Sequence, residues 1–258
     1  MNLNLSGRHV LVTCGSKGIG LACAKAFLDE GAHVAITSRS DENLAAARAT
    51  LGSIVAVPAD LVQPALALEM VDRVERELGS IDILVNSAGA ARRTAPDELT
   101  TEAWRAAMDA KYFTYINVID PVIKRMASRN RGVIANIVGS GGKMAAQTHL
   151  PGGAANAALM LATVGLANSY AAKGVRVFAV NPGLTKTTRV AEGLKAEAAL
   201  HGISEADALQ RSVDRIPMGR LAEPEEIAAV VVFGASDCAS YLTGAVITMD
   251  GASAPIVI

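Results

Sequence analysis

Short apolar runs alternate with longer segments of helical periodicity along the whole chain, and this alternation restricts the fold more than any other feature. The apolar runs predict β-strands at residues 8–13, 33–38, 54–60, 81–89, 132–140, 175–183 and 245–251. The patterns between them predict helices at residues 21–31, 41–52, 66–79, 101–130, from about 152 onward, and 224–236. Continuously apolar strands separated by helices are typical of a parallel sheet that is covered on both faces. We therefore predict an α/β protein with a doubly wound parallel sheet and helices on both faces.

The domain organisation is predicted to be simple. The chain has 258 residues and contains no linker, internal repeat or low-complexity segment, so we expect a single domain over residues 1–258. The least patterned region, residues 184–220, is polar, helix-prone and flanked by prolines. Such a segment is typical of a mobile substrate lid.

Composition excludes several classes of partner. A formal net charge of −1 and an aromatic content of 3% give no reason to expect nucleic acid or an anionic membrane surface. The start of the chain has no apolar signal core and the apolar runs are short, so we expect a cytoplasmic protein without membrane contact. Cys14, Cys23 and Cys238 are odd in number and widely separated, which argues against a disulfide framework. His33 and His201 have no metal-ligand spacing, so we expect no metal.

A glycine-rich turn, VTCGSKGIG at residues 12–20, follows the first predicted strand and opens the first helix. Glycines let the backbone approach a pyrophosphate, and a helix N-terminus offers free N–H groups and the positive end of a dipole. The alternative is a tight strand-to-helix turn without a ligand. The position in the first strand–helix unit of an α/β chain favours a phosphate-binding loop.

With this loop the sequence resembles the short-chain dehydrogenase/reductase family, in particular its members that are similar to 3-oxoacyl-acyl-carrier-protein reductases. The resemblance covers nearly the whole chain and rests on Thr13, Gly18, Ile19 and Gly20 of the loop, Asp60-Leu61, Asn86-Ser87-Ala88-Gly89, Asn181-Pro182-Gly183 with Thr187, and residues 215–252. It implies a single Rossmann-like domain, a nicotinamide cofactor, and hydride transfer between that cofactor and a carbonyl or alcohol.

The resemblance also implies which residues contact the cofactor. These are Thr13, Gly15, Ser16, Lys17, Gly18, Ile19, Gly20, Ser38, Arg39, Asp60, Leu61, Asn86, Ala88, Gly89, Asn156, Pro182, Gly183, Thr185 and Thr187. One departure lies in the loop itself, where Cys14 replaces the first glycine of the family. A Cβ there either shifts the backbone or crowds the cofactor, and Gly15 is the residue that can take over the close approach.

NADP(H) is the cofactor that we expect to be preferred over NAD(H). Ser38 stands at the end of the second strand, where an aspartate would accept the ribose hydroxyls of NAD. Arg39 follows it and Lys17 lies in the loop, and cations at these positions hold the 2′-phosphate in NADP-using members of the family. The alternative is two solvated surface cations.

The catalytic positions depart most from the family. Ser140 matches the serine that polarises the substrate oxygen, but Gly152 and Asn156 replace the tyrosine acid and its lysine partner. Lys111 stands where the family has a supporting asparagine. Because lysine and asparagine have exchanged positions, we predict that Lys111 supplies the ammonium near the ribose and that Asn156 supplies the amide. The alternative is that Lys111 is a surface or interface cation.

No residue restores the tyrosine hydroxyl at position 152. His149 precedes the empty position by three residues and has an ordinary pKa suited to acid–base work near neutrality. Lys143 in the same loop and a water oriented by Ser140 are the other candidate proton donors. The alternatives are a loop histidine without a special role and a strand-end serine that bonds backbone.

The predicted substrate region is mostly small and apolar, which suggests a moderately hydrophobic substrate. Arg92-Arg93 lies beside the expected cleft and could bind a carboxylate or phosphate, although a solvated loop is the alternative. By resemblance we expect a homotetramer, with the 102–128 and 152–170 helices at one interface and the apolar end of the chain at another.

Three readings of the function follow. The first is an NADP(H)-dependent oxidoreductase with a rearranged active site. The second is a catalytically inactive NADP(H)-binding sensor or partner subunit, which the joint loss of tyrosine and lysine favours. The third is the same fold recruited to a non-redox reaction, because fold alone does not decide chemistry.

Overall fold

Seven parallel strands form one sheet in the computed structural model, which describes residues 1–89 and 93–256. The strand order is β3-β2-β1-β4-β5-β6-β7, and all neighbouring pairs are parallel. The bounds are β1 (His9–Thr13), β2 (His33–Ser38), β3 (Val55–Pro58), β4 (Ile83–Asn86), β5 (Gly132–Ile137), β6 (Val175–Pro182) and β7 (Val246–Met249). Each strand lies within its predicted range, and the Rossmann-like α/β fold is confirmed.

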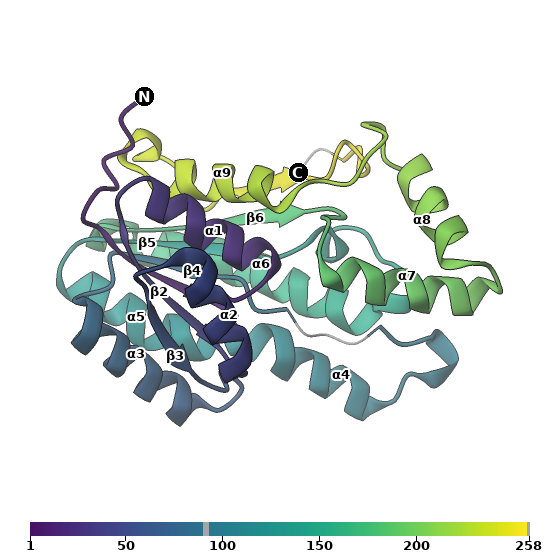
Figure 1. The fold of residues 1–258 in the computed structure, drawn as a ribbon, viewed down its shortest axis with the longest axis horizontal. Coiled ribbons are helices and arrows are strands. Elements are labelled where there is room, and N and C mark those ends of the chain that lie inside the picture. Colours follow the sequence, from purple (N-terminus) through teal and green to yellow (C-terminus); the bar gives the residue numbers. More distant parts are fainter. Residues whose placement is uncertain (90–92, 257–258) are drawn as a thin grey trace.

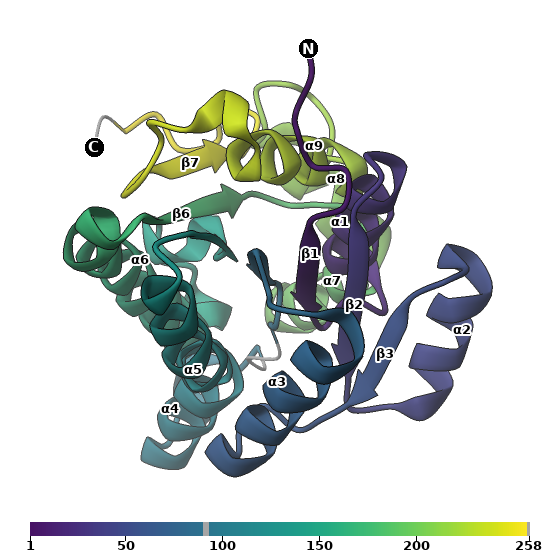
Figure 2. The ribbon, with the colours of Figure 1, turned by 90° about the vertical axis from the view of Figure 1, so that its left-hand side faces the viewer.

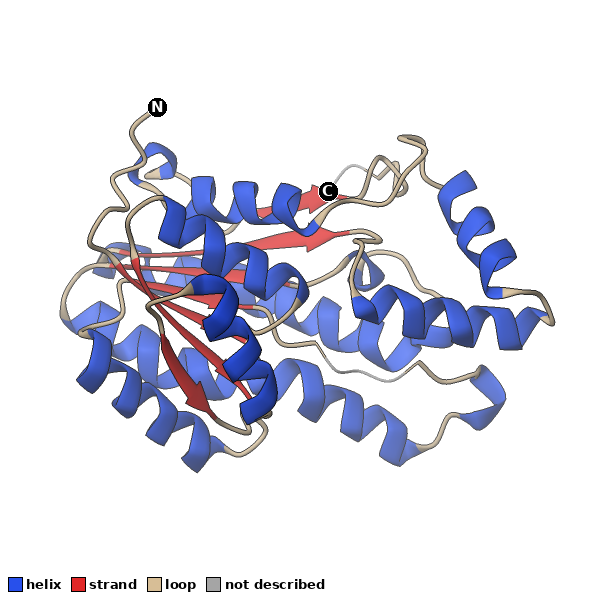
Figure 3. Ribbon diagram, viewed as in Figure 1, coloured by secondary structure: helices blue, strands red, loops and turns tan. Residues whose placement is uncertain are grey.

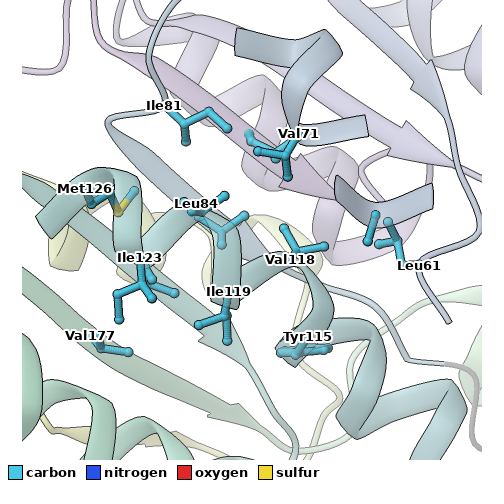
Figure 4. Close-up of a cluster of buried hydrophobic side chains, with 14 of the residues drawn as sticks. Leu61, Val71, Ile81, Leu84, Tyr115, Val118, Ile119, Ile123, Met126 and Val177 are labelled. Atoms are coloured by element: carbon cyan, nitrogen blue, oxygen red, sulfur yellow. The ribbon is translucent and has the colours of Figure 1, made fainter. Parts of the chain in front are cut away.

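Helices cover both faces of the sheet, as Figures 1 and 2 show from two directions. In Figure 3 the red strands lie between layers of blue helices. One face carries α1 (Gly18–Asp29), α2 (Asp41–Leu51) and α9 (Pro224–Ala235), and the other carries α3 (Pro64–Leu78), α5 (Thr114–Ser128) and α6 (Leu150–Tyr170). Each layer buries its own hydrophobic cluster against the sheet, and Figure 4 shows part of the α3–α5 cluster.

The long helix predicted at residues 101–130 is interrupted. It consists of α4 (Thr101–Ala107), a π-helical turn η2 (Met108–Phe113) and α5. A π turn inserts an extra residue into the helix and is frequently found at functional sites. Lys111 lies in this turn and is buried. Hydrophobic periodicity in the sequence did not reveal this interruption.

The ends of β1, β4 and β5 are joined by a buried polar chain. Thr13 Oγ1 donates to Asn86 Oδ1 at 3.4 Å, and Asn86 Nδ2 donates to Asn136 Oδ1 at 3.0 Å. Asn136 Nδ2 then donates to Thr163 Oγ1 on α6 at 3.0 Å. Because these groups are buried, each one depends on its neighbour for a hydrogen bond.

We expect Asn136→Ala to lower the free energy of unfolding by about 2–4 kcal/mol, since it leaves the Asn86 amide without its buried acceptor and opens a small cavity. Urea denaturation followed by circular dichroism measures the change. Asn2→Ala at the exposed N-terminus is the control and should change stability by less than about 0.5 kcal/mol. A loss of less than about 1 kcal/mol for Asn136→Ala would show that the polar chain contributes little.

Residues 184–220, which are helix-prone in sequence, contain two helices, α7 (Thr188–His201) and α8 (Glu205–Asp214). In Figure 1 these green helices project beyond the carboxyl ends of the strands. They pack against each other and lie over the site described below.

One helical stretch, Gln147–Lys173, is long and apolar enough by length and composition to cross a membrane, with a mean hydropathy of 1.4 in a search of the described residues. In this fold α6 packs against β6 and the segment after β5. Its inner side contributes Ala155, Leu159 and Ala167 to the buried residues, as expected for a core helix, whereas Leu161 and Val164 face outward.

Candidate functional site

The carboxyl ends of β1 and β4 lie side by side in the sheet although β2 and β3 intervene in the sequence. The sheet is therefore built in two directions from β1, through β2 and β3 on one side and through β4 to β7 on the other. Where the strand order reverses in this way, a crevice forms between the loops that follow the two strands. The phosphate loop follows β1, and the Asn86–Gly89 segment begins at the end of β4. The fold thus places both predicted cofactor segments at one crevice.

The phosphate loop is a bare backbone turn that leads into α1. A Cβ built at Gly20 would lie 2.6 Å from the Cys14 carbonyl oxygen, and one at Gly15 would lie 2.7 Å from Ile36 Cγ2. Gly18 has a left-handed φ of 53°. A side chain at Gly15 or Gly20 would require neighbouring atoms to move, and Gly18 adopts its left-handed φ without strain. The N–H groups of the first turn of α1 can bind an anion.

Cys14 keeps the shape of this loop although it is not a glycine. Its φ is 51°, the left-handed conformation that glycine would adopt freely, at a cost of about 1–2 kcal/mol for a residue with a Cβ. Its side chain packs against the hydrophobic cluster of α3 and α5. Burial raises the pKa of the Cys14 thiol, so the side chain is a neutral apolar group. Cys14 therefore adopts the left-handed conformation that a glycine would favour, and its side chain lies on the hydrophobic cluster.

A cavity of about 490 Å³ lies at the carboxyl ends of β2 and β3, and Arg39 and Asp60 are among its lining residues. Arg39 is exposed and makes no ion pair with the described residues. Asp60 Oδ1 accepts a hydrogen bond from Val62 N at 3.2 Å, and Leu61 is buried in the core. Leu61 can therefore contact a ligand only through its backbone.

The segment after β6 connects the crevice to α7 and α8. Thr185 is buried and donates to the Gly183 carbonyl oxygen at 3.2 Å. Thr187 is the residue before α7, and a Cβ built at Gly18 would lie 3.1 Å from its Cγ2. The base of α7 therefore touches the phosphate loop.

Lys111 lies under the strand ends, not on the surface. Its Nζ donates to the Ala88 carbonyl oxygen at 2.9 Å and to the Ile137 carbonyl oxygen at 3.0 Å, after β4 and at the end of β5. A Cβ built at Gly89 would lie 3.6 Å from this Nζ. Burial, followed by the positive charge of Arg189, lowers the pKa of Lys111 to about 7. The Lys111 side chain therefore gains or loses its proton near pH 7, and it lies beneath Ala88 and Gly89, which are predicted to bind the cofactor.

Tyr115 is a partner that sequence reasoning missed. Its hydroxyl accepts a hydrogen bond from Lys111 Nζ at 2.9 Å and donates to the Ile137 carbonyl oxygen at 2.5 Å. The side chain is fully buried, and Figure 4 labels it among the residues of the α3–α5 cluster. The spacing of four residues between Lys111 and Tyr115 was a signal in the sequence, because residues four apart meet on one side of a helix.

Asn156 is also buried, and its Oδ1 has no hydrogen-bond partner among the described residues. Its Nδ2 lies toward the turn after β5, 3.1 Å from a Cβ built at Gly139. No hydrogen bond joins Asn156 to Lys111 in the described part of the chain. The exchanged pair therefore does not form a direct contact, and the transposed network stays a prediction.

The imidazole of His149 occupies the space beside Gly152 that a side chain would fill. A Cβ at Gly152 would lie 2.1 Å from His149 Cε1 and 2.6 Å from its Nε2. Nδ1 is buried without a partner in the described residues. Burial and then the charges of Arg93, Arg189 and Lys111 lower the pKa of His149 to about 4. The expectation of an imidazole that titrates near neutrality is therefore wrong, and at pH 7 the ring is a neutral donor and acceptor.

His149 and Ser140 share a cavity of about 620 Å³ between the loop after β5 and α7. Its lining also includes Met144, Leu184, Val190, Leu194, Arg93, Glu197 and Arg215. It is therefore not as uniformly apolar as the sequence suggested. Lys143, a candidate proton donor, instead donates to Thr248 on β7 at 3.0 Å and does not line the cavity. Arg92 lies outside the described residues.

A bound nicotinamide cofactor fits these features. The bare loop at the start of α1 suits a pyrophosphate, and the orphaned Asn156 Oδ1 is a buried acceptor that lacks a donor. Among the described residues, no group of three His, Cys, Asp or Glu side chains lies close enough to hold a metal ion.

Comparisons with known proteins match this geometry. The family profile described as enoyl-(acyl carrier protein) reductase matches residues 14–252. Acetoacetyl-CoA reductase of Shinella zoogloeoides is 34% identical over 244 residues, covering 95% of this chain and 97% of that protein. The 3-oxoacyl-[acyl-carrier-protein] reductase FabG of Thermotoga maritima is 31% identical over 253 residues, covering 96% and 98%.

Two solved structures extend the comparison. A variant of actinorhodin polyketide ketoreductase with NADPH has a TM-score of 0.92 at 27% identity, covering 96% of this chain and 97% of that one. An NADPH-bound short chain oxidoreductase from Pseudomonas aeruginosa PAO1, described as containing an atypical catalytic center, has a TM-score of 0.87 at 30% identity, covering 97% and 98%.

Proposed function

The chain belongs to the short-chain dehydrogenase/reductase family, and from this premise we propose that it is an NADP(H)-dependent oxidoreductase with a rearranged active site. Its substrate is a carbonyl compound or the corresponding alcohol. The observation that carries the proposal is the His149 ring, which lies where a side chain at position 152 would project. The family's tyrosine is thereby replaced in space by a residue from three positions earlier.

The residues of the chain divide the work of carbonyl reduction. The nicotinamide supplies the hydride when it is bound. Ser140 Oγ and a ring N–H of His149 donate hydrogen bonds to the substrate oxygen and stabilise the negative charge that develops on it. A neutral imidazole can act in this way without first becoming protonated. The proton then comes from a water that the ring orients, so that His149 stays neutral throughout.

Lys111 and Asn156 support this site from below. Asn156 Oδ1 accepts a hydrogen bond from a ribose hydroxyl, which satisfies the orphaned buried acceptor. Lys111 holds the Ala88 and Ile137 carbonyls in place and donates a third hydrogen bond to the Tyr115 hydroxyl. Lys111 is a positioning residue, since it bonds backbone carbonyls at the crevice floor.

Arg39 is the residue proposed to select NADP(H). We expect Arg39→Ala to weaken NADPH binding by about tenfold or more, because it removes charge-assisted hydrogen bonds to the 2′-phosphate, and to leave NADH binding within about twofold. Nicotinamide fluorescence titration measures both dissociation constants. Arg105→Ala, an exposed arginine on α4, is the matched control. Equal weakening of NADPH and NADH would assign Arg39 to general folding or charge effects.

The experiment that tests the function is a titration with NADPH and NADH, followed by a panel of carbonyl and alcohol substrates. Tight NADPH binding with turnover supports the proposal. NADPH binding without turnover on any substrate would favour a non-catalytic sensor. One observation also favours that alternative, because the Lys111 ammonium donates its hydrogen bonds to Ala88, Tyr115 and Ile137 within the protein. Failure to bind either cofactor would overturn the oxidoreductase assignment.

We further propose that the protein acts as one cytoplasmic domain that assembles into a homotetramer. The exposed side chains of Leu161, Val164 and Phe113 give the outer sides of α6 and η2 an apolar character that a second copy would cover. Residues 184–220, with α7 and α8, are proposed to act as the lid over the substrate cavity.

A further inference from the structure

The substrate cavity has a charged end that hydride transfer to a simple ketone does not require. Arg93 and Arg215 bring positive charge to its lining, and Glu197 is the carboxylate among the lining residues. Glu197 Oε1 already lies 3.2 Å from His201 Nε2 on the same helix. The described lining therefore carries more positive than negative formal charge, with two arginines and one glutamate.

Arg93 is held in this position by contacts from two directions. Its Nη1 donates to Thr148 Oγ1 at 3.3 Å, and the neighbouring Thr94 N donates to the Thr148 carbonyl oxygen at 3.0 Å. On the other side, the guanidinium lies against α7 at Gly193, where a Cβ would be 2.7 Å from Arg93 Nε. Glycine at position 193 thus leaves the space that the guanidinium occupies.

Among the described residues, Glu197 offsets the charge of Arg93 only in part. The guanidinium makes no ion pair within 4.0 Å among the described residues, and Thr148 is its one hydrogen-bond acceptor there. Burial lowers the pKa of Arg93 despite the opposing effect of Glu197. A half-buried cation without an ion-pair partner lowers the stability of the folded protein. A role in binding an anionic ligand accounts for a cation at this position.

We infer that this end of the cavity binds a carboxylate of the substrate, so that the substrate is an oxo acid or the corresponding hydroxy acid. This inference rests on the proposed function and deepens it. The planar guanidinium matches a carboxylate in a bidentate arrangement. Met144, Leu184, Val190 and Leu194 line the rest of the cavity and suit an aliphatic chain.

The carboxylate is expected close to the reacting carbonyl. Arg93 is hydrogen-bonded to Thr148, the residue next to His149, and its charge is one of those that affect the His149 ring. An oxo group a few bonds from the acid would therefore reach His149 and Ser140 while the carboxylate remains on Arg93. Substrates in which many bonds separate the oxo group from the carboxylate do not fit, because Arg93 and His149 lie close together.

Binding of hexanoate and hexanamide, measured by calorimetry on the NADP⁺-loaded protein at low salt, tests the carboxylate site without requiring turnover. We expect hexanoate to bind at least about tenfold more tightly than hexanamide, and Arg93→Gln to abolish that difference. Arg105→Gln on α4 is the control and should retain it. Equal binding of the acid and the amide to the unchanged protein would overturn the inference, and tighter binding of hexyl phosphate than of hexanoate would overturn the choice of a carboxylate.

Kinetics with NADPH separate this inference from the proposed function. Aliphatic oxo acids should be reduced with a higher kcat/KM than their methyl esters, and Arg93→Gln should lower kcat/KM for the acids by about thirtyfold or more while the esters change by less than about threefold. An equal loss for acids and esters would overturn the carboxylate role. Acid-selective binding without any turnover would support the anion site and contradict the oxidoreductase proposal.

Discussion

His149→Ala is expected to lower kcat for carbonyl reduction by about a hundred- to ten-thousandfold, the range associated with the loss of a general acid or its equivalent hydrogen bond. The physical reason is that the ring fills the space beside Gly152, where the atoms nearest to a built Cβ are Cε1, Nε2 and Nδ1 of His149. The dissociation constant for NADPH should change by less than about threefold, because the imidazole faces the substrate cavity. Single-turnover kinetics and fluorescence titration measure the two effects.

The control for this prediction is His33→Ala, an exposed histidine at the start of β2. A second variant, Gly152→Ala, tests the position of the ring, since its Cβ would lie 2.1 Å from His149 Cε1 and must displace it. We expect this variant to lose activity and to keep NADPH binding. If His149→Ala retains more than about one fifth of the kcat, a water or Ser140 supplies the hydrogen bond and the role of His149 is wrong.

The pH dependence of activity gives an independent check on His149. Its pKa of about 4 means that the ring is already neutral at pH 5.5, so activity should not decline between pH 5.5 and 7 through loss of an imidazolium proton. The titratable and charged groups around the ring are Arg93, Arg189, Lys111, Glu197 and His201.

Lys111→Met is expected to remove a large pH dependence of stability. In the folded protein the pKa of Lys111 is lowered to about 7, whereas a solvated lysine, as in the unfolded chain, has a pKa of 10.5. Between these values the unfolded state binds the proton and the folded state does not, so stability rises with pH. From pH 7 to 8.5 the gain should be about 2 kcal/mol, and below pH 7 the full cost of the buried ammonium is present.

Urea denaturation of the cofactor-free protein at pH 6, 7, 8 and 8.5 measures this gain. The upper limit matters because the raised pKa values of Cys14 and Cys23 reduce stability once unfolded thiols ionise. Lys124→Met, at an exposed position on α5, is the control and should keep the pH dependence. If Lys111→Met shows the same slope as the unchanged protein, the buried ammonium is not its source.

Part of the site could be predicted from sequence because it depends on short-range order along the chain. The positions of Gly15, Gly18 and Gly20 follow from the backbone demands of a strand-to-helix turn at a phosphate. The structure also places Ser140 and His149 at one cavity, since both lie in the loop between β5 and α6.

Other parts of the site could not be predicted in this way. The π turn at residues 108–113 leaves no mark on the hydrophobic pattern, yet it carries Lys111 in the buried interior. Two of the partners of Lys111 are carbonyls after β4 and at the end of β5, and Arg93 lies against Gly193, 100 positions later in the sequence. Contacts of this kind depend on which loops the sheet order brings together.

The sequence by itself determined the fold class, the strand ranges and the place of the cofactor loop, because hydrophobic periodicity and glycine-dependent turns are local properties that the chain carries in its order of residues. Only the tertiary structure decided the protonation of His149 and Lys111. A side chain's pKa depends on its burial and on the charges that surround it. For His149 these are Arg93, Arg189 and Lys111, which reach it from separate loops and helices once the sheet has formed.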